Sequence, residues 1–188
     1  MKRLFLAINI PEDIKEKIAH KRDLLESLVP GVRFMGEENW HITLVFLGEQ
    51  GDEALLPIIK SMKDLIPSFA CPEINFSDIS YGPVKGVPRM IWLNGDEKTS
   101  KALSILKTRL EDGLIKNGVR FKLENREFRT HITLAKFSED LRGGLPELSR
   151  EFRDLNWSFE AEGLDLIESQ LSSKGAKYEI LQSMEFKR

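Results

Sequence analysis

The tetrapeptide His-Ile-Thr-Leu occurs twice in this chain, at residues 41–44 and again at residues 131–134. The chain has three histidines, so the two copies hold two of them. Successive side chains of an extended strand point to opposite faces, so the His and Thr of each copy share one face while the Ile and Leu point into the core. Each copy therefore presents one imidazole beside one hydroxyl. One copy alone would more often be an ordinary half-buried strand, but two copies in equivalent contexts favour a site.

The repetition extends upstream of both tetrapeptides. Gly-Val-Arg-Phe precedes each copy, at residues 31–34 and 118–121, and a strand-like run followed by a helix-like stretch comes before it. We interpret this as an internal duplication of a strand, helix, strand, strand unit, with repeats at approximately residues 3–47 and 89–137. Two copies of one unit usually pack about a pseudo-twofold axis, which would carry the two motif strands to opposite sides of one cleft. The site is therefore expected between two lobes.

The apolar pattern predicts an α+β fold. Helical spacing indicates a helix that begins at Pro11 and is closed by Gly31, a second over residues 55–65, and a third over residues 103–114 that stops at Asn117-Gly118. Strand patterns fall on the two motif segments and on residues 74–79, 89–93, 119–123, 157–169 and 177–186. We expect a single bilobal domain over residues 1–188, with two duplicated sheet-plus-helix lobes around a central cleft.

Composition excludes several classes of protein. A single cysteine, Cys71, cannot form an intramolecular disulfide, and three scattered histidines give no metal-ligand cluster of the usual spacing. We therefore expect chemistry without a metal or cofactor, in a reducing, cytoplasmic setting, and no run approaches membrane-spanning length. The net charge of −2 argues against sequence-independent wrapping of duplex nucleic acid. The net charge does not exclude a local anion site, because residues 116–136 include six basic residues and only two acidic ones.

The paired motifs suit acid-base chemistry on a phosphate. An ordinary histidine pKa of about 6.5 lets one imidazole be neutral and the other protonated near neutral pH. A threonine hydroxyl two residues further on can donate to a phosphate oxygen, which suits a transition state that gathers negative charge there. Serine or cysteine nucleophile schemes fit less well, since there is no Gly-x-Ser-x-Gly elbow and Cys71 has no histidine nearby in sequence. A glycine-rich triphosphate loop is also absent from the sequence.

Further segments carry a likeness to a known family. They are residues 3–8, 38–44, 46–49, 88–93, 129–136, 168–171 and 175–178. Together with the motifs, they make the chain resemble the two-histidine (2H) phosphoesterases, and within these the prokaryotic RNA 2′,3′-cyclic phosphodiesterases, also called 2′-5′ RNA ligases. Family members commonly carry arginine where this chain has Lys136 and Gln170, so it lacks two guanidinium groups that could grip phosphate bidentately.

The resemblance implies a function and roles for the motif residues. His41, Thr43, His131 and Thr133 would surround a 2′,3′-cyclic phosphate and hydrolyse it to a 2′-phosphomonoester without a metal. The family likeness assigns His131 as the base that activates water and His41 as the acid that protonates the leaving 3′-oxygen. In the reverse direction the roles exchange, and a 5′-hydroxyl in place of water would give a 2′-5′ linkage without ATP.

Substrate contacts are expected from residues close to the motifs, namely Arg126, Arg129, Lys136 and Trp40. Lys136 alternates away from His131 along the strand, so its contacts are expected to be with the flanking backbone. Trp40, Trp92 and Phe46 are candidates for stacking on a base, but aromatic strand residues are more often core, and Phe46 is expected to be buried.

The substrates expected for such a site are RNA ends that carry a 2′,3′-cyclic phosphate, tRNA fragments among them, or small cyclic nucleotides. We expect the chain to act as a monomer and away from membranes. A function of a different class stays open, in which the chain is a nucleotide-binding or RNA-binding module that keeps the cleft without turnover. Tight binding of a nucleotide with no hydrolysis of any cyclic phosphate would favour that alternative.

Overall fold

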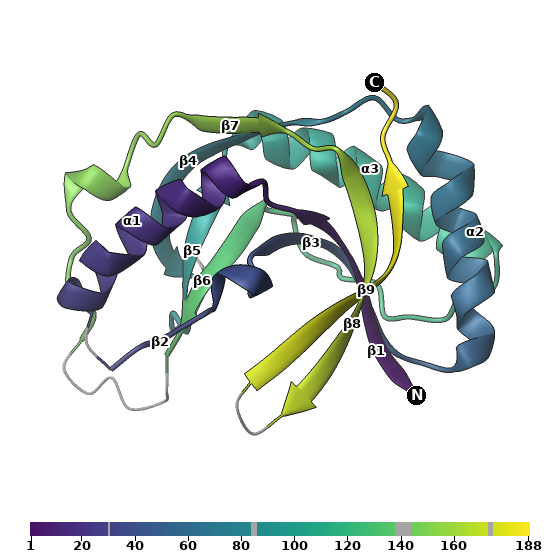
Figure 1. Ribbon diagram of the computed structural model, residues 1–188, viewed down its shortest axis with the longest axis horizontal. Coiled ribbons are helices and arrows are strands. Elements are labelled where there is room, and N and C mark those ends of the chain that lie inside the picture. The colour runs from purple at the N-terminus through teal and green to yellow at the C-terminus, as the bar shows by residue number, and fades with distance from the viewer. Residues whose placement is uncertain (30, 84–85, 138–143, 173–174) are drawn as a thin grey trace.

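The computed structural model describes residues 1–29, 31–83, 86–137, 144–172 and 175–188. The strands form two antiparallel sheets (Figure 1). Sheet A contains, in spatial order, β3 (His41–Gln50), β1 (Lys2–Asn9), β8 (Gly163–Ser172) and β9 (Gly175–Glu185). Sheet B contains β2 (Arg33–Phe34), β6 (His131–Lys136), β5 (Met90–Gly95), β4 (Glu73–Gly82) and β7 (Trp157–Glu160).

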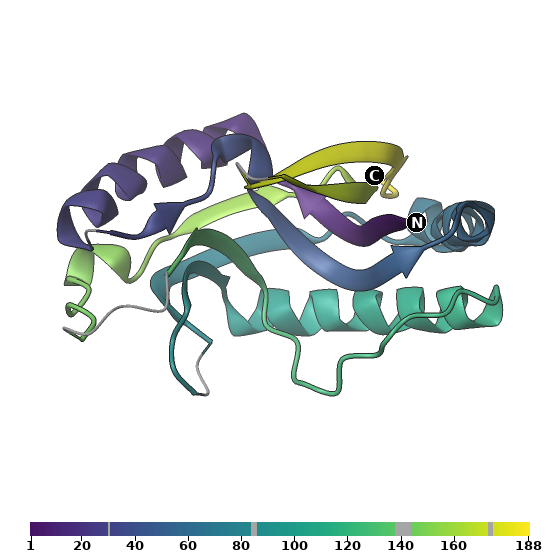
Figure 2. The ribbon, with the colours of Figure 1, turned by 90° about the horizontal axis from the view of Figure 1, so that it is seen from below.

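The helices of the described residues are α1 (Glu12–Leu28), α2 (Leu55–Leu65) and α3 (Glu97–Lys116), with short 3₁₀ turns at Glu37–Asn39, Asp52–Ala54, Ile66–Ser68 and Arg150–Phe152. Figure 2 shows α1 and α3 on opposite sides of the molecule, with the sheets between them. The Asp96 carboxylate starts α3 by accepting the backbone N–H of Thr99 at 2.7 Å. The leucines that predicted this helix are fully buried along one side of it.

The predicted α+β fold with two duplicated lobes is confirmed. The first repeat supplies β1, α1, β2 and β3, and the second supplies β5, α3 and β6. In both repeats the first strand pairs antiparallel with the motif strand, and the register places Asn9 opposite His41 and Asn94 opposite His131. The two histidines therefore occupy equivalent positions in the two sheets.

Two predicted strands are wrong. Residues 119–123 form no strand, because backbone and side-chain bonds hold them in a loop: the Val119 N–H donates to the Leu114 carbonyl, and the Gln50 amide donates to the Arg120 carbonyl at 2.9 Å. Residues 157–169, predicted as one strand, belong to β7 and β8, which lie in different sheets. An alternating pattern alone does not reveal that the chain changes sheets.

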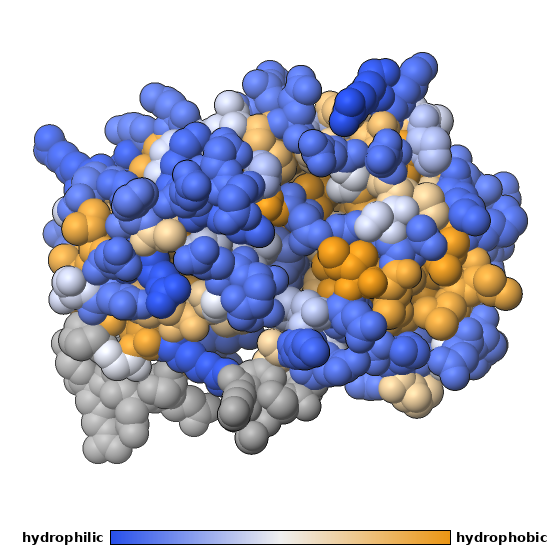
Figure 3. All heavy atoms as spheres, in the orientation of Figure 1, coloured by the Kyte–Doolittle hydropathy of each residue, from blue (hydrophilic) through white to orange (hydrophobic). Residues whose placement is uncertain are grey.

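One continuous core joins the two sheets. It includes Leu6 and Ile42 from sheet A and Leu93 and Ile132 from sheet B, all of them fully buried. Figure 3 shows a mostly hydrophilic face, with hydrophobic side chains gathered toward the side that carries α2, where Leu56 is 78% exposed. Within the described ranges, none of the helices combines the length and the apolar composition needed to span a bilayer.

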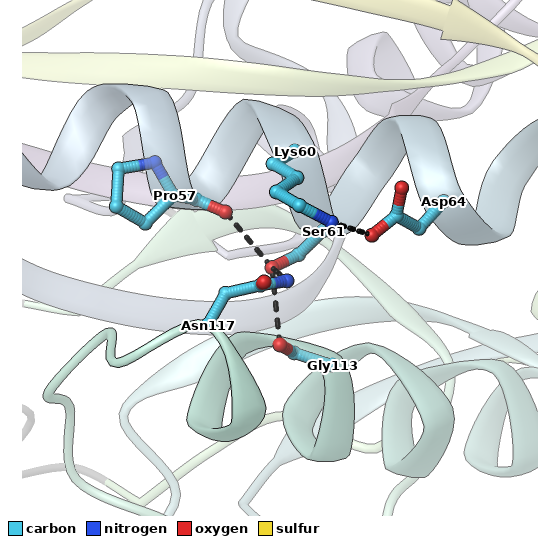
Figure 4. Close-up of polar contacts among 6 residues, drawn as sticks. All are labelled: Pro57, Lys60, Ser61, Asp64, Gly113 and Asn117. Carbon is cyan, nitrogen blue, oxygen red and sulfur yellow. Dashed lines mark hydrogen bonds and ion pairs between the residues drawn. The ribbon is translucent and has the colours of Figure 1, made fainter.

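A buried serine ties α2 to the end of α3 (Figure 4). The Ser61 hydroxyl lies 2.9 Å from the Pro57 carbonyl oxygen and 3.2 Å from the Gly113 carbonyl oxygen, and it accepts the Asn117 side-chain amide at 2.9 Å. Ser61 is only 2% exposed. Removing its hydroxyl would leave the Asn117 amide and the Gly113 carbonyl without this partner.

We therefore expect Ser61→Ala to lower the free energy of unfolding by about 2 kcal/mol, measured by urea denaturation. Ser27→Ala is the matched control, because the exposed Ser27 hydroxyl also bonds to the carbonyl one turn earlier, that of Asp23, at 3.2 Å. This control should change stability by less than about 0.5 kcal/mol. Equal effects of the two substitutions would show that Ser61 does not join the helices.

Candidate active site

Each motif histidine is the first residue of its strand and is oriented by the backbone two residues earlier. Nδ1 of His41 lies 2.8 Å from the Asn39 carbonyl oxygen, and Nδ1 of His131 lies 2.8 Å from the Arg129 carbonyl oxygen. Because a carbonyl can only accept, Nδ1 carries the proton in both rings. Nε2 is therefore the nitrogen that exchanges protons in each neutral imidazole.

Aromatic rings pack against both imidazoles. The His41 ring lies 4.9 Å from the Phe5 ring and 5.1 Å, edge-on, from the Tyr178 ring, centroid to centroid. The His131 ring lies 4.1 Å from the Trp92 ring at an angle of 31°. Trp92 can approach this closely because residue 82 is glycine, where a Cβ would overlap the indole. The rings therefore fix the imidazole planes and exclude water from one side of each.

This environment lowers both histidine pKa values. Burial lowers the pKa of His41 to about 4, opposed by the hydrogen bond to Asn39 and assisted by the positive charges of His131 and Lys136. Burial also lowers the pKa of His131, although the hydrogen bond to Arg129 opposes it. Both rings are thus neutral in the free protein near neutral pH.

The depressed pKa of His41 makes stability depend on pH. The unfolded chain takes up a proton at this residue near pH 6.5, whereas the folded protein does so only near pH 4. The free energy of unfolding should therefore fall as the pH drops through this window, by up to about 3 kcal/mol, with no further loss from His41 below it. Urea denaturation across this range tests the effect, and His41→Gln should flatten the slope. An unchanged slope in that variant would assign the pH dependence to other groups.

A pocket of about 190 Å³ lies beside His131, and His41 is not among the residues that line it. Its lining residues come from both lobes, and they are Thr43, Leu44, Phe46, Pro83, Trp92, Lys107, Glu124, Arg126, Glu127, Phe128, Arg129 and His131. Thr133 lies on the same face of β6 as His131, opposite Trp92. No group of three or more His, Cys, Asp and Glu side chains in the described ranges is arranged to hold a metal ion.

A β-bulge follows the threonine in both motif strands and changes which residues face the cleft. The register skips Leu44 in β3 and Leu134 in β6, so two adjacent residues in each strand are buried and the alternation reverses. Phe46 is consequently 49% exposed and lines the pocket. Lys136 is exposed and lowers the pKa of His41. The predictions that Phe46 is buried and that Lys136 points away from the site are therefore wrong.

Of the residues predicted to contact the substrate, two arginines line the pocket and Trp40 does not. Arg126 and Arg129 line the pocket, and they pair with Glu124 at 2.9 Å and with Glu127 at 3.2 Å. Trp40 does not reach it, because that side chain is 2% exposed and packs in the core. As the neighbour of His41, it points to the opposite face of the chain, which corrects the prediction of a substrate contact.

Several side chains that shape the site belong to neither His-Ile-Thr-Leu motif. Phe5 and Tyr178 hold His41, and Phe128 and Lys107 line the pocket. Phe5 and Tyr178 fall inside the segments that resemble the family, so that resemblance was the available signal. Nothing in the sequence pattern distinguishes Lys107 from the other polar residues of its helix.

Known proteins resemble this chain in sequence and in fold. A family model described as LigT like phosphoesterase matches residues 8–92. The chain is 32% identical over 181 residues to the RNA 2′,3′-cyclic phosphodiesterase of Methanocaldococcus jannaschii, spanning 95% of this chain and 98% of that protein. It is 29% identical over 186 residues to the protein of the same name from Archaeoglobus fulgidus, spanning 97% and 99%. E. coli LigT complexed with 3′-AMP superposes with a TM-score of 0.77 at 25% identity, over 100% of this chain and 99% of that one.

Proposed function

The chain is a hydrolase that belongs to the LigT-like phosphoesterase family. We propose that it hydrolyses the 2′,3′-cyclic phosphate at an RNA end to a 2′-phosphomonoester. The observation that carries the proposal is the matched pair His41 and His131. Both rings have Nδ1 committed to a backbone carbonyl, which leaves Nε2 free for proton transfer. Relatives of nearly the same length are named for this activity.

The proposed reaction needs one proton acceptor and one proton donor. Nε2 of the base takes a proton from water while the water oxygen forms a bond to phosphorus. The bond from phosphorus to the 3′-oxygen breaks, and that oxygen takes a proton from Nε2 of the acid. The hydroxyls of Thr43 and Thr133 donate to the non-bridging oxygens as negative charge gathers on them. Exchange of protons with water restores the starting state.

We assign His131 as the base and His41 as the acid, as the family likeness implies. His41 must then be protonated in the complex, although its pKa is about 4 in the free protein. A phosphodiester anion supplies the cause, because an opposite charge in a site screened from water by Phe5 and Tyr178 raises the pKa of an imidazole.

A substrate with sulfur at the 3′ position tests these roles, since a thiolate leaves without protonation. His41→Ala should lose far less activity on this substrate than on the oxygen substrate, whereas His131→Ala should lose the same on both. Rescue of His131→Ala instead would reverse the assignment.

Three basic side chains are proposed to hold the substrate. Lys136 would contact the phosphate as a point charge, where the family commonly supplies a guanidinium. Arg126 and Arg129 would contact the backbone of the RNA at the pocket mouth, and would exchange their glutamate partners for phosphate. The site is built from two strands of one chain, so we propose that the monomer is the active unit.

The direct test is product analysis with chelator present. RNA oligonucleotides, tRNA fragments and small cyclic nucleotides that carry a 2′,3′-cyclic phosphate are each offered to the protein. We expect 2′-phosphomonoesters, fastest from RNA, with turnover unaffected by the chelator. A 3′-phosphate product would contradict the proposed bond cleavage, and tight nucleotide binding without any hydrolysis would indicate a binding module instead.

Ligation would use the same chemistry with a different nucleophile. A 5′-hydroxyl RNA end replaces water, attacks phosphorus and displaces the 3′-oxygen, which gives a 2′-5′ phosphodiester without ATP. Incubation with both RNA ends should therefore yield some product that resists nucleases specific for 3′-5′ linkages. The same histidine substitutions should abolish both hydrolysis and ligation, because both reactions use the same two proton transfers.

A further inference from the structure

A second, larger hollow continues from the catalytic pocket along α3. This groove has a volume of about 950 Å³. It shares seven lining residues with the catalytic pocket, including Trp92, Phe128 and Arg126. The catalytic pocket and the groove are therefore adjacent, and a ligand with its phosphate at His131 lies next to the groove.

The floor of the groove is the cleft face of sheet B. Asn94 on β5 lies opposite His131, and Asp78 on β4 lies opposite Asn94, so these residues follow His131 on the same face of the sheet. The Asn94 side-chain amide donates to Asp78 at 2.9 Å and to Ser80 at 2.7 Å. Both amide hydrogens are thus used, and the carbonyl oxygen of Asn94 is left as an acceptor.

One wall of the groove is a face of α3. The hydroxyl residues Ser100, Ser104 and Thr108 lie along this wall. Ile105, also in the lining, is 56% exposed, which is unusual for a large aliphatic side chain beside a binding cleft. The wall thus offers hydrogen-bonding groups next to an apolar surface.

The groove has no excess of positive charge, because its lining contains five acidic and four basic side chains. Each basic side chain that lines it is paired with an acidic one, and the pairs are Lys101 with Glu97, Lys107 with Glu111, Arg126 with Glu124 and Arg129 with Glu127. Deep in the groove there is therefore no excess positive charge to attract a phosphate. Hydroxyls, an amide acceptor and apolar surface suit an uncharged sugar and base instead.

We propose that this groove binds the penultimate nucleoside, the one before the nucleoside that carries the cyclic phosphate, so that the site recognises an oligonucleotide end rather than a mononucleotide. The base packs against Ile105 and Phe128, and the polar edge of the nucleoside meets Asn94 and the hydroxyls of α3. The phosphate that links the two nucleosides lies at the junction of pocket and groove, near Arg126 and Arg129. This inference rests on the proposed function and names the substrate class of the same site.

The experiment compares kcat/KM for a dinucleotide and for a mononucleotide, both ending in a 2′,3′-cyclic phosphate. The mononucleotide does not reach the groove, so it serves as the reference for each variant. The wild type should favour the dinucleotide by about tenfold, mostly through KM, as one stacked base can supply. Equal values for the two substrates would overturn the groove proposal. Absence of hydrolysis of either substrate would refute the phosphodiesterase itself.

Two pairs of variants locate the preference. Ser104→Trp fills the groove and should reduce the dinucleotide preference to about one, whereas Ala102→Trp adds the same bulk to α3 outside the groove and should keep it. Ile105→Ala should weaken the preference several-fold, whereas Ile115→Ala, at a residue of the same helix that is 52% exposed and outside both cavities, should not. A preference that survives both groove variants would contradict the proposed location.

Discussion

Replacing His41 or His131 by alanine is expected to lower kcat on an RNA ending in a 2′,3′-cyclic phosphate by at least about three orders of magnitude. Each substitution removes one of the two proton transfers, because it removes an imidazole whose Nδ1 is bonded to a backbone carbonyl and whose Nε2 is free to exchange a proton. Single-turnover measurement of 2′-phosphate formation tests this result without interference from product release.

The double variant should be little slower than the worse single variant, because the two groups act together on one bond. His20→Ala, on α1, is the control and should retain full activity. Activity near the wild-type level in both single variants would refute the two-histidine mechanism. A large loss in only one of them would mean that the other imidazole is structural.

The second large effect is expected at the threonines. Thr43→Val and Thr133→Val should each lower kcat by about 100-fold while changing KM little, because their hydroxyls act on charge that develops in the transition state. The valine keeps the shape and the β-branching of threonine, so the strands should remain folded. Thr→Ser at each position should restore most of the activity. A loss that falls mainly on KM would indicate ground-state binding instead.

The sequence predicted the features that repeat and missed those that depend on a neighbouring strand. The doubled tetrapeptide and the helical leucine stripes were sufficient for an α+β fold with a site between two lobes. The positions of Phe46 and Lys136 were predicted wrongly, because one extra residue directly after each motif threonine reverses the alternation. Two adjacent apolar residues after each threonine were the available signal.

The two lobes also share a contact that involves residues outside the repeated sequence. Asn9, opposite His41, donates to Asp165, and Asn94, opposite His131, donates to Asp78. The two aspartates lie on β8 and β4, outside both repeats, and strand pairing brings each of them next to its asparagine: Asp78 lies opposite Asn94, and Asp165 lies opposite Ala7. Local pattern therefore predicts which residues alternate, whereas tertiary pairing decides which side chains become neighbours.

The central claim is that two imidazoles bind one phosphate, and nitrogen NMR of the histidine rings tests it most directly. The chain has three histidines, so each ring signal can be assigned with one substitution. On titration with adenosine 2′-monophosphate, the Nε2 signals of His41 and His131 should shift together with one common affinity, and the signal of His20 should stay. A response from only one of the two rings, or two different affinities, would contradict the shared site.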